Sequence, residues 1–145
     1  MSLRVPPKLL AEIGRHGESH YPEEAAGLIF GAVDGETRSA RGVFPLANVF
    51  EPEQRGRRYQ INPRDILHAE DEAERLGLDV VGVFHSHPDH PPTPSQFDLD
   101  HAVPWYVYLI TSVRQGVAAE SRAWKLRDDH SQMIEELLTI EQEAR

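Results

Sequence analysis

The stretch Leu78-Asp79-Val80-Val81-Gly82-Val83-Phe84 leads directly into His85-Ser86-His87-Pro88. Its mainly aliphatic composition, rich in valine, is typical of a strand buried in the middle of a sheet. Because side chains alternate between the two faces of a strand, His85 and His87 point to the same side and Ser86 points away. The sequence therefore predicts two imidazoles held together at the C-terminal end of a central strand.

The rest of the chain predicts further strands and helices around this central strand. Asp34-Gly35 is a strong hairpin signal, and Asn62-Pro63 supplies a cap and a first residue for a helix. The expected elements are helices over 7–13, 63–77 and 131–142, a short helix after Ser95, and strands over 25–33, 38–45, 59–61, 105–111 and 117–126. The order α-β-β-β-α-β-β-β-α, with the short helix inserted, predicts an α/β or α+β domain with a mixed sheet covered by helices.

The length and composition of the chain fit a single domain over residues 1–145. Its apolar runs are far too short to cross a bilayer, and its first residues lack a secretory signal, so we expect a cytoplasmic protein without membrane contact. The absence of cysteine excludes disulfides and every thiolate zinc site. The formal net charge of −9 argues against nucleic acid as a partner, because nonspecific binding to nucleic acid needs a cationic surface.

A carboxylate and a hydroxyl follow the two histidines at a spacing that suits a metal site. Asp98 lies beyond a proline-rich loop that limits how the chain returns. Two imidazoles and one carboxylate suit Zn²⁺, and three protein ligands leave a fourth position open, as in catalytic zinc sites. Ser95 and Asp98 are spaced as neighbours on a helical turn. The residues favour metal-assisted hydrolysis, although Asp98 alone also fits a helix-start carboxylate and Ser95 alone an N-cap.

A zinc hydrolase of this kind also needs a general base, and two glutamates are candidates. Glu23 and Glu24 immediately precede the buried strand predicted over 25–33. Either carboxylate is suitably placed only if that strand lies beside the strand that carries the histidines. On the residues alone, both glutamates also fit exposed charge before a strand, and this alternative stays open.

Together these residues resemble the motif of the JAMM (MPN+) metalloprotease family, which is Glu, then His-Ser/Thr-His-Pro, then Ser-x-x-Asp. Glu24, His85-Ser86-His87-Pro88 and Ser95-Gln96-Phe97-Asp98 match this pattern. The segment Tyr21-Pro22-Glu23-Glu24-Ala25-Ala26-Gly27-Leu28 also resembles the start of small bacterial members. Ala26 is one departure, since many of those members carry cysteine there. The resemblance extends from about residue 6 to about residue 126, which is most of the chain.

The resemblance implies a deaminase-like α/β/α sandwich with a strongly curved mixed sheet, and one Zn²⁺ per chain. His85, His87 and Asp98 correspond to the metal ligands of the family. Glu24 corresponds to the residue that activates the zinc-bound water, and Ser95 to a residue that helps stabilise the oxyanion. The family also implies a metallopeptidase or isopeptidase that cuts after the C-terminal Gly-Gly of a ubiquitin-like or sulfur-carrier protein. Exposed sheet edges in so small a domain permit a homodimer.

Two other functions stay open on the sequence. His85-Ser86-His87-Pro88-Asp89-His90 also fits His-x-His-x-Asp-His, the metal signature of metallo-β-lactamase-type hydrolases, which would use Asp89 and His90 in place of Asp98. The second alternative is a non-catalytic MPN-type module that only binds proteins. The basic cluster Arg55-Gly56-Arg57-Arg58 fits either a solvated loop or a docking patch for an acidic partner.

Overall fold

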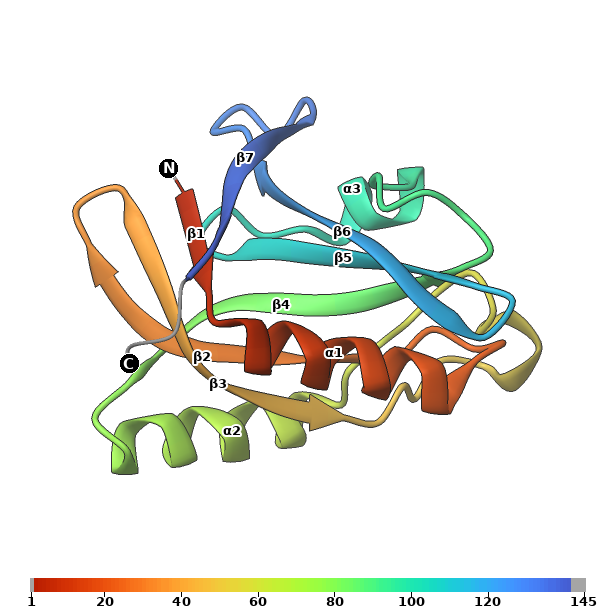
Figure 1. Cartoon of the computed structure of the whole chain (residues 1–145), viewed down its shortest axis with the longest axis horizontal. Helices are drawn as coiled ribbons and strands as arrows, with labels where there is room; N and C mark the ends of the chain where they lie inside the picture. The colour runs from red at the N-terminus through yellow and green to blue at the C-terminus, as the bar shows by residue number, and fades with distance from the viewer. Residues whose placement is uncertain (1, 142–145) are drawn as a thin grey trace.

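The computed structural model describes residues 2–141, which form a mixed sheet with helices packed against it (Figure 1). The strands are β1 Ser2–Val5, β2 Ala26–Asp34, β3 Thr37–Leu46, β4 Asp79–Pro88, β5 Val107–Arg114, β6 Val117–Leu126 and β7 Met133–Ile140. The α-helices are α1 Pro7–His20, α2 Pro63–Arg75 and α3 Gln96–His101, and a short 3₁₀ helix covers Pro52–Gln54.

The strand order is β1-β3-β2-β4-β5-β6-β7, and pairing of β7 with β1 closes the sheet into a barrel. Strand β1 runs parallel to both of its neighbours and β4 runs parallel to β5, whereas the other pairs are antiparallel. The mixed α/β class is therefore confirmed, but the sheet closes into a barrel where a strongly curved sheet between helices, an α/β/α sandwich, was expected. Closure depends on β1, whose four residues are too few to show a hydrophobic period in the sequence.

The C-terminal helix predicted over 131–142 is wrong. Met133–Ile140 forms β7, which pairs antiparallel with β6 and parallel with β1. The segment is rich in leucine and glutamate, which favour helix locally, but that preference is small compared with the backbone bonds and packing gained between two strand edges. The last residue of the predicted helix, Gln142, lies outside the described residues.

Most other predicted elements are confirmed, with shifted ends. The β2–β3 hairpin turns at Asp34-Gly35, and α2 begins at Asn62, whose side chain accepts a hydrogen bond from the Arg64 amide at 2.9 Å. Helix α1 continues to His20, beyond its expected end. The strand predicted over 59–61 is absent, and these residues lie in the loop between β3 and α2. Among the described residues, no helix is long and apolar enough to cross a membrane.

Two hydrophobic clusters pack on opposite faces of the central strands. Strand β4 contributes to both, because Phe84 lies in the cluster with α1 and Val83 lies in the cluster with α2. Figure 1 shows α1 lying in front of the sheet and α2 lying beneath it. His85 and His87 share the face of Val83 by the strand alternation, so both imidazoles point away from α1.

Candidate metal centre

Strands β2 and β4 are antiparallel neighbours, and this pairing brings Glu24 to the histidines. Ala26 is paired with His85, so Glu24, two residues earlier, lies beside the end of β4 that carries His87. Ala25 and Ser86 fix the register, because the Ser86 amide donates to the Ala25 carbonyl at 3.0 Å and the Ala25 amide donates to Ser86 Oγ at 2.8 Å. The condition that the sequence left open for the glutamates is therefore met.

Three potential ligand atoms form a compact triangle at this end of the sheet. Nε2 of His85 and Nε2 of His87 are 3.2 Å apart, and Oδ2 of Asp98 lies 3.3 Å from the first and 3.1 Å from the second. All three side chains are buried. The structure thus brings together the three residues that the sequence selected as ligands.

Backbone and aromatic contacts orient the two imidazoles. Nδ1 of His87 donates to the Pro91 carbonyl at 2.9 Å, which directs Nε2 at the triangle. The ring of His85 stacks on Tyr59 with centroids 4.5 Å apart. Burial lowers the pKa of His85, so this ring is neutral near pH 7, as a metal ligand must be.

A capping box holds Asp98 at the start of α3. The Asp98 amide donates to Ser95 Oγ at 3.0 Å, and the Ser95 amide donates to Asp98 Oδ2 at 2.9 Å. Burial raises the pKa of Asp98, but His85, His87 and the Ser95 amide outweigh burial, so its pKa lies well below the usual range. The carboxylate is therefore ionised at any ordinary pH. Ser95 is the N-cap of α3 in this structure, which confirms one of the two roles that the sequence suggested for it.

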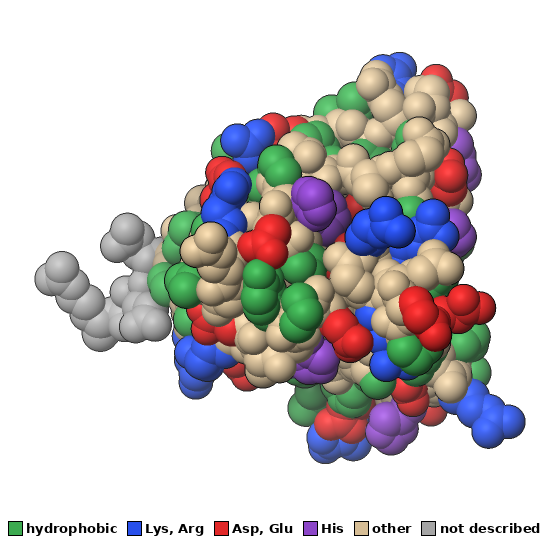
Figure 2. Space-filling model, turned by 90° about the vertical axis from the view of Figure 1, so that its right-hand side faces the viewer, with side chains coloured by type: hydrophobic (Ala, Val, Ile, Leu, Met, Phe, Trp, Pro, Cys, Tyr) green, Lys and Arg blue, Asp and Glu red, His purple; other side chains and the backbone are tan. Residues whose placement is uncertain are grey.

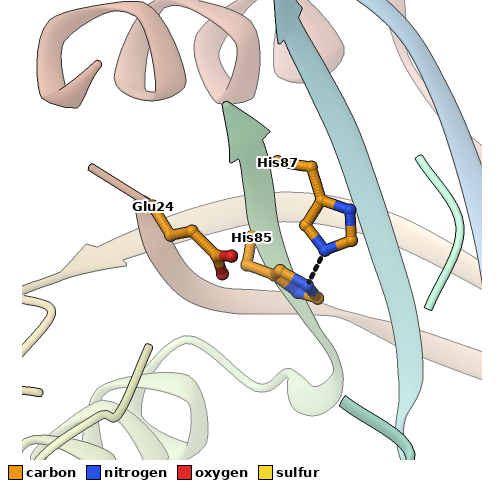
Figure 3. A group of neighbouring side chains, drawn as sticks. All are labelled: Glu24, His85 and His87. Carbon is orange, nitrogen blue, oxygen red and sulfur yellow. Dashed lines mark hydrogen bonds between the residues drawn. The ribbon is translucent and has the colours of Figure 1, made fainter. Parts of the chain in front are cut away.

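Glu24 directs a buried carboxylate at the same two imidazoles, as Figure 3 shows. An oxygen of its carboxylate lies within 4.8 Å of a ring nitrogen of each histidine. Its Oε1 is buried and has no hydrogen-bond partner among the described residues. Burial raises the pKa of Glu24 to about 8, against an opposing effect of His87. Glu23, in contrast, is only half-buried. The structure places Glu24 at the site and leaves Glu23 outside it.

Asp89 and His90 do not join the triangle. Asp89 is exposed, and its carboxylate accepts hydrogen bonds from the Tyr21 hydroxyl at 2.6 Å and from the Gln115 amide at 2.8 Å. His90 is also exposed. The geometry favours the arrangement with Asp98 and removes the basis of the metallo-β-lactamase interpretation.

A cleft of about 310 Å³ opens beside Asp98. Apolar and aromatic side chains dominate its walls. They come from β4, β5, α3, the segment between α3 and β5, and the loop between β3 and α2: Phe50, Tyr59, Val83, Phe97, Tyr106 and Tyr108. The cleft places an apolar surface next to Asp98.

Two residues of the loop before α2 contribute to the site without any signal in the sequence. Tyr59 supports the ring of His85, although its segment was expected to form a strand. Asn48 is buried and hydrogen-bonded to the backbone of Glu24. A lone asparagine or tyrosine in a loop carries no periodicity and no motif, so only the folded structure brings them to the site.

Comparison with known proteins agrees with the fold and the site. Residues 6–127 match the family described as prokaryotic homologs of the JAB domain. The chain is 37% identical over 93 residues to the desampylase of Haloferax volcanii, covering 63% of this chain and 63% of that protein. It is 32% identical over 123 residues to a probable TtuB-protein conjugate cleaving protease of Thermus thermophilus, covering 83% and 78%.

A solved structure extends the comparison over nearly the whole chain. The solution structure of a protein from Desulfitobacterium hafniense superposes with a TM-score of 0.85 at 29% identity, covering 97% of this chain and 94% of that one. The buried imidazole pair with flanking carboxylates thus lies in a known fold and forms a group of side chains that could hold a metal ion. The chain belongs to the family of prokaryotic JAB-domain homologs, and the resemblance to the JAMM (MPN+) family is confirmed.

Proposed function

We propose that this protein is a zinc-dependent isopeptidase that hydrolyses the bond after the C-terminal Gly-Gly of a ubiquitin-like or sulfur-carrier protein. One observation carries the proposal most directly. Three ligand atoms, from His85, His87 and Asp98, lie 3.1–3.3 Å apart, and the unpartnered Oε1 of Glu24 lies in the carboxylate beside them. Such an arrangement combines a metal site with a group able to move a proton.

The donor set fits zinc. Nitrogen and oxygen ligands at about 2.0–2.1 Å from a tetrahedral ion are separated from one another by about 3.3 Å, close to the observed spacing. Two neutral imidazoles and one carboxylate leave one coordination position for water or substrate, and the hydrogen bond from His87 to Pro91 is the outer contact that such ligands need. A bound zinc ion supplies a Lewis acid that lowers the pKa of water and polarises the scissile carbonyl.

Glu24 is the residue we assign to proton transfer. Its carboxylate accepts the proton of the attacking water and passes it to the nitrogen of the departing amine. Its pKa, raised to about 8, lies close enough to neutral pH for the carboxylate to accept a proton and give it up again. Ser95 is the residue we assign to the oxyanion, since its hydroxyl lies at the start of α3 beside Asp98.

The substrate class rests on the relatives and on the cleft. The names of the Haloferax and Thermus proteins describe cleavage of protein conjugates. A Gly-Gly tail has no side chains, so it approaches buried ligand atoms without steric conflict, and the aromatic cleft beside Asp98 accommodates an apolar residue that precedes it. We also propose that the protein is cytoplasmic, that it does not bind nucleic acid and that it can form a homodimer.

The basic cluster Arg55-Gly56-Arg57-Arg58 is our candidate for docking the acidic surface of the substrate. Arg58 lies over the ring of Phe97, 5.2 Å from its centroid, so the cluster borders the cleft. Figure 2 shows basic, acidic and histidine side chains interspersed over this end of the molecule. The cluster is therefore expected to attract only those acidic groups of the substrate that come close to it. Arg57→Glu is expected to raise KM severalfold, whereas Arg15→Glu on α1, also exposed, is expected to leave KM unchanged. Equal KM values would remove the docking role.

A fusion of a sulfur-carrier protein with a short extension after Gly-Gly tests the proposed function. Wild type is expected to contain about one zinc per chain and to cleave the fusion. Glu24→Gln is expected to keep zinc and lose at least a thousandfold in kcat. Zinc-loaded wild type that cleaves neither this fusion nor an isopeptide-linked conjugate would overturn the proposal in favour of a binding module.

A further inference from the structure

Asn48 is buried at the start of the loop between β3 and α2, and its side-chain amide makes four hydrogen bonds. Nδ2 donates to the Glu24 carbonyl at 2.9 Å and to the Arg58 carbonyl at 3.0 Å. Oδ1 accepts from the Phe50 and Gln60 amides, each at 3.1 Å. This equals the full bonding capacity of an amide, so no part of the group is free to turn.

The backbone of Glu24 is held by this loop on both sides of its α-carbon. Its carbonyl accepts from Asn48, and its amide donates to the Arg55 carbonyl at 2.7 Å. The peptide between Glu24 and Ala25 is also held by β4, because the Ala25 amide donates to Ser86 Oγ. Glu24 precedes β2, so strand pairing alone does not position it. The loop over 47–62 therefore decides where the carboxylate of Glu24 lies.

The same loop lines the cleft beside Asp98. Phe50, Tyr59 and Gln60 contribute to the walls, and the first and third of these donate their amides to Asn48. A segment bound in the cleft would press on peptides that are one hydrogen bond away from Asn48. The side chain of Asn48 is thus the shared connection between the cleft wall and the backbone of Glu24.

We propose that Asn48 is a positioning residue that holds Glu24 in register with the metal ligands through the Glu24 carbonyl. This inference rests on the proposed function, in which Glu24 transfers the proton. A displacement of about 1 Å in a reacting group costs on the order of a hundredfold in rate. Loss of the contact from Asn48 is therefore expected to lower kcat more than it raises KM.

Two substitutions separate positioning from loop support. Asn48→Asp keeps the acceptor for the Phe50 and Gln60 amides but can donate to neither the Glu24 nor the Arg58 carbonyl, whereas Asn48→Ala removes all four hydrogen bonds. Asn62→Ala is the matched control, because Asn62 ends the same loop and caps α2 without contacting Glu24. We expect Asn48→Asp to lower kcat tenfold to about a hundredfold with KM within about twofold, and Asn62→Ala to leave kcat unchanged.

A second measurement needs no substrate. Amide hydrogen exchange of Glu24 in the zinc-loaded protein reports whether its bond to the Arg55 carbonyl opens. Faster exchange in both Asn48 variants, with unchanged zinc content and unchanged exchange in Asn62→Ala, is the expected result. Unchanged exchange, or a kcat equal to wild type in Asn48→Asp, would overturn the inference. If wild type cleaves no substrate, the proposed function fails and the exchange rates alone decide the role of Asn48.

Discussion

Nε2 of His87 lies 3.1 Å from Oδ2 of Asp98, although a proline-rich loop separates the two residues in the chain. The loop is anchored in three places along its length. The Pro91 carbonyl accepts from His87 Nδ1, the Pro92 carbonyl accepts from Trp124 Nε1 at 2.9 Å, and the His90 carbonyl accepts from Ser112 Oγ at 2.7 Å. These contacts within the protein hold α3 against the end of β4.

Asp98→Ala is expected to abolish zinc binding, because the variant loses one of three ligands and leaves two imidazoles that cannot hold the ion alone. Zinc measured by atomic absorption after dialysis is expected to fall from about one per chain to near zero. Asp89→Ala is the control, since this carboxylate bonds to Tyr21 and Gln115 at the surface. Loss of zinc in Asp89→Ala with retention in Asp98→Ala would reverse the assignment.

The sequence predicted the convergence of His85, His87 and Asp98 and the central strands because both depend on local spacing. Alternation along β4 places His85 and His87 on one face, and a single capped turn orients Asp98. The closure of the sheet was not predictable in this way. It depends on pairing between β1 and β7, at opposite ends of the chain, and β7 has a composition that favours helix. Asn48 escaped prediction because its four partners are backbone groups, which leave no pattern in the sequence.

Metal-free protein is expected to lose stability as the pH rises, because of Glu24. Its pKa is about 8 in the folded protein against an ordinary value of 4.5, chiefly through burial. Between these values the unfolded chain has released the proton and the folded chain still binds it. The contribution of protonated Glu24 to the stability of the folded protein is thus fully present below about pH 4.5 and is lost as the pH rises to about 8. The loss is at most about 1.4 kcal/mol per pH unit.

Glu24→Gln removes that titration. The free energy of unfolding of the metal-free variant is therefore expected to exceed that of metal-free wild type by a few kcal/mol at pH 8 and by little at pH 5. Urea unfolding at pH 5, 6.5 and 8 in the presence of a chelator measures the difference. Glu23→Gln, which changes the neighbouring half-buried carboxylate, serves as the comparison and is expected to parallel wild type. A difference between Glu24→Gln and wild type that does not grow with pH would contradict the burial argument.

Ser95 has two roles to separate, the cap of α3 and the proposed contact with the oxyanion. Ser95→Ala removes both and is expected to cost about 1 kcal/mol of stability. Ser95→Gly retains most of the capping preference but has no hydroxyl, so it is expected to lose only a few tenths of a kcal/mol. If the hydroxyl contacts the oxyanion, both variants lose tenfold or more in kcat. If kcat falls in Ser95→Ala but not in Ser95→Gly, the loss of activity follows the loss of stability. Ser95 would then act only as the N-cap of α3.

Gly27 is a position where we expect the addition of a single methyl group to cause a large loss of stability. A Cβ there would meet the ring of Phe84 well inside van der Waals contact and would lie 2.6 Å from the Phe44 carbonyl oxygen. The ring is fully buried and the carbonyl belongs to the paired strand β3, so neither can move away cheaply. Gly27→Ala is expected to cost at least about 2 kcal/mol, as overpacked cores do.

Gly42, in β3, provides the matched control, because a Cβ at that position meets no atom within 4 Å. Gly42→Ala is expected to be neutral or slightly stabilising, since it reduces the conformational entropy of the unfolded chain. Thermal unfolding of the zinc-loaded proteins compares the two variants, and the midpoint of Gly27→Ala is expected to fall by several degrees. Because Phe84 immediately precedes His85, Gly27→Ala is also expected to weaken zinc binding. Equal midpoints for the two alanine variants would show that β2 and β4 adapt to the added methyl group and that close packing at Gly27 does not hold the metal ligands in place.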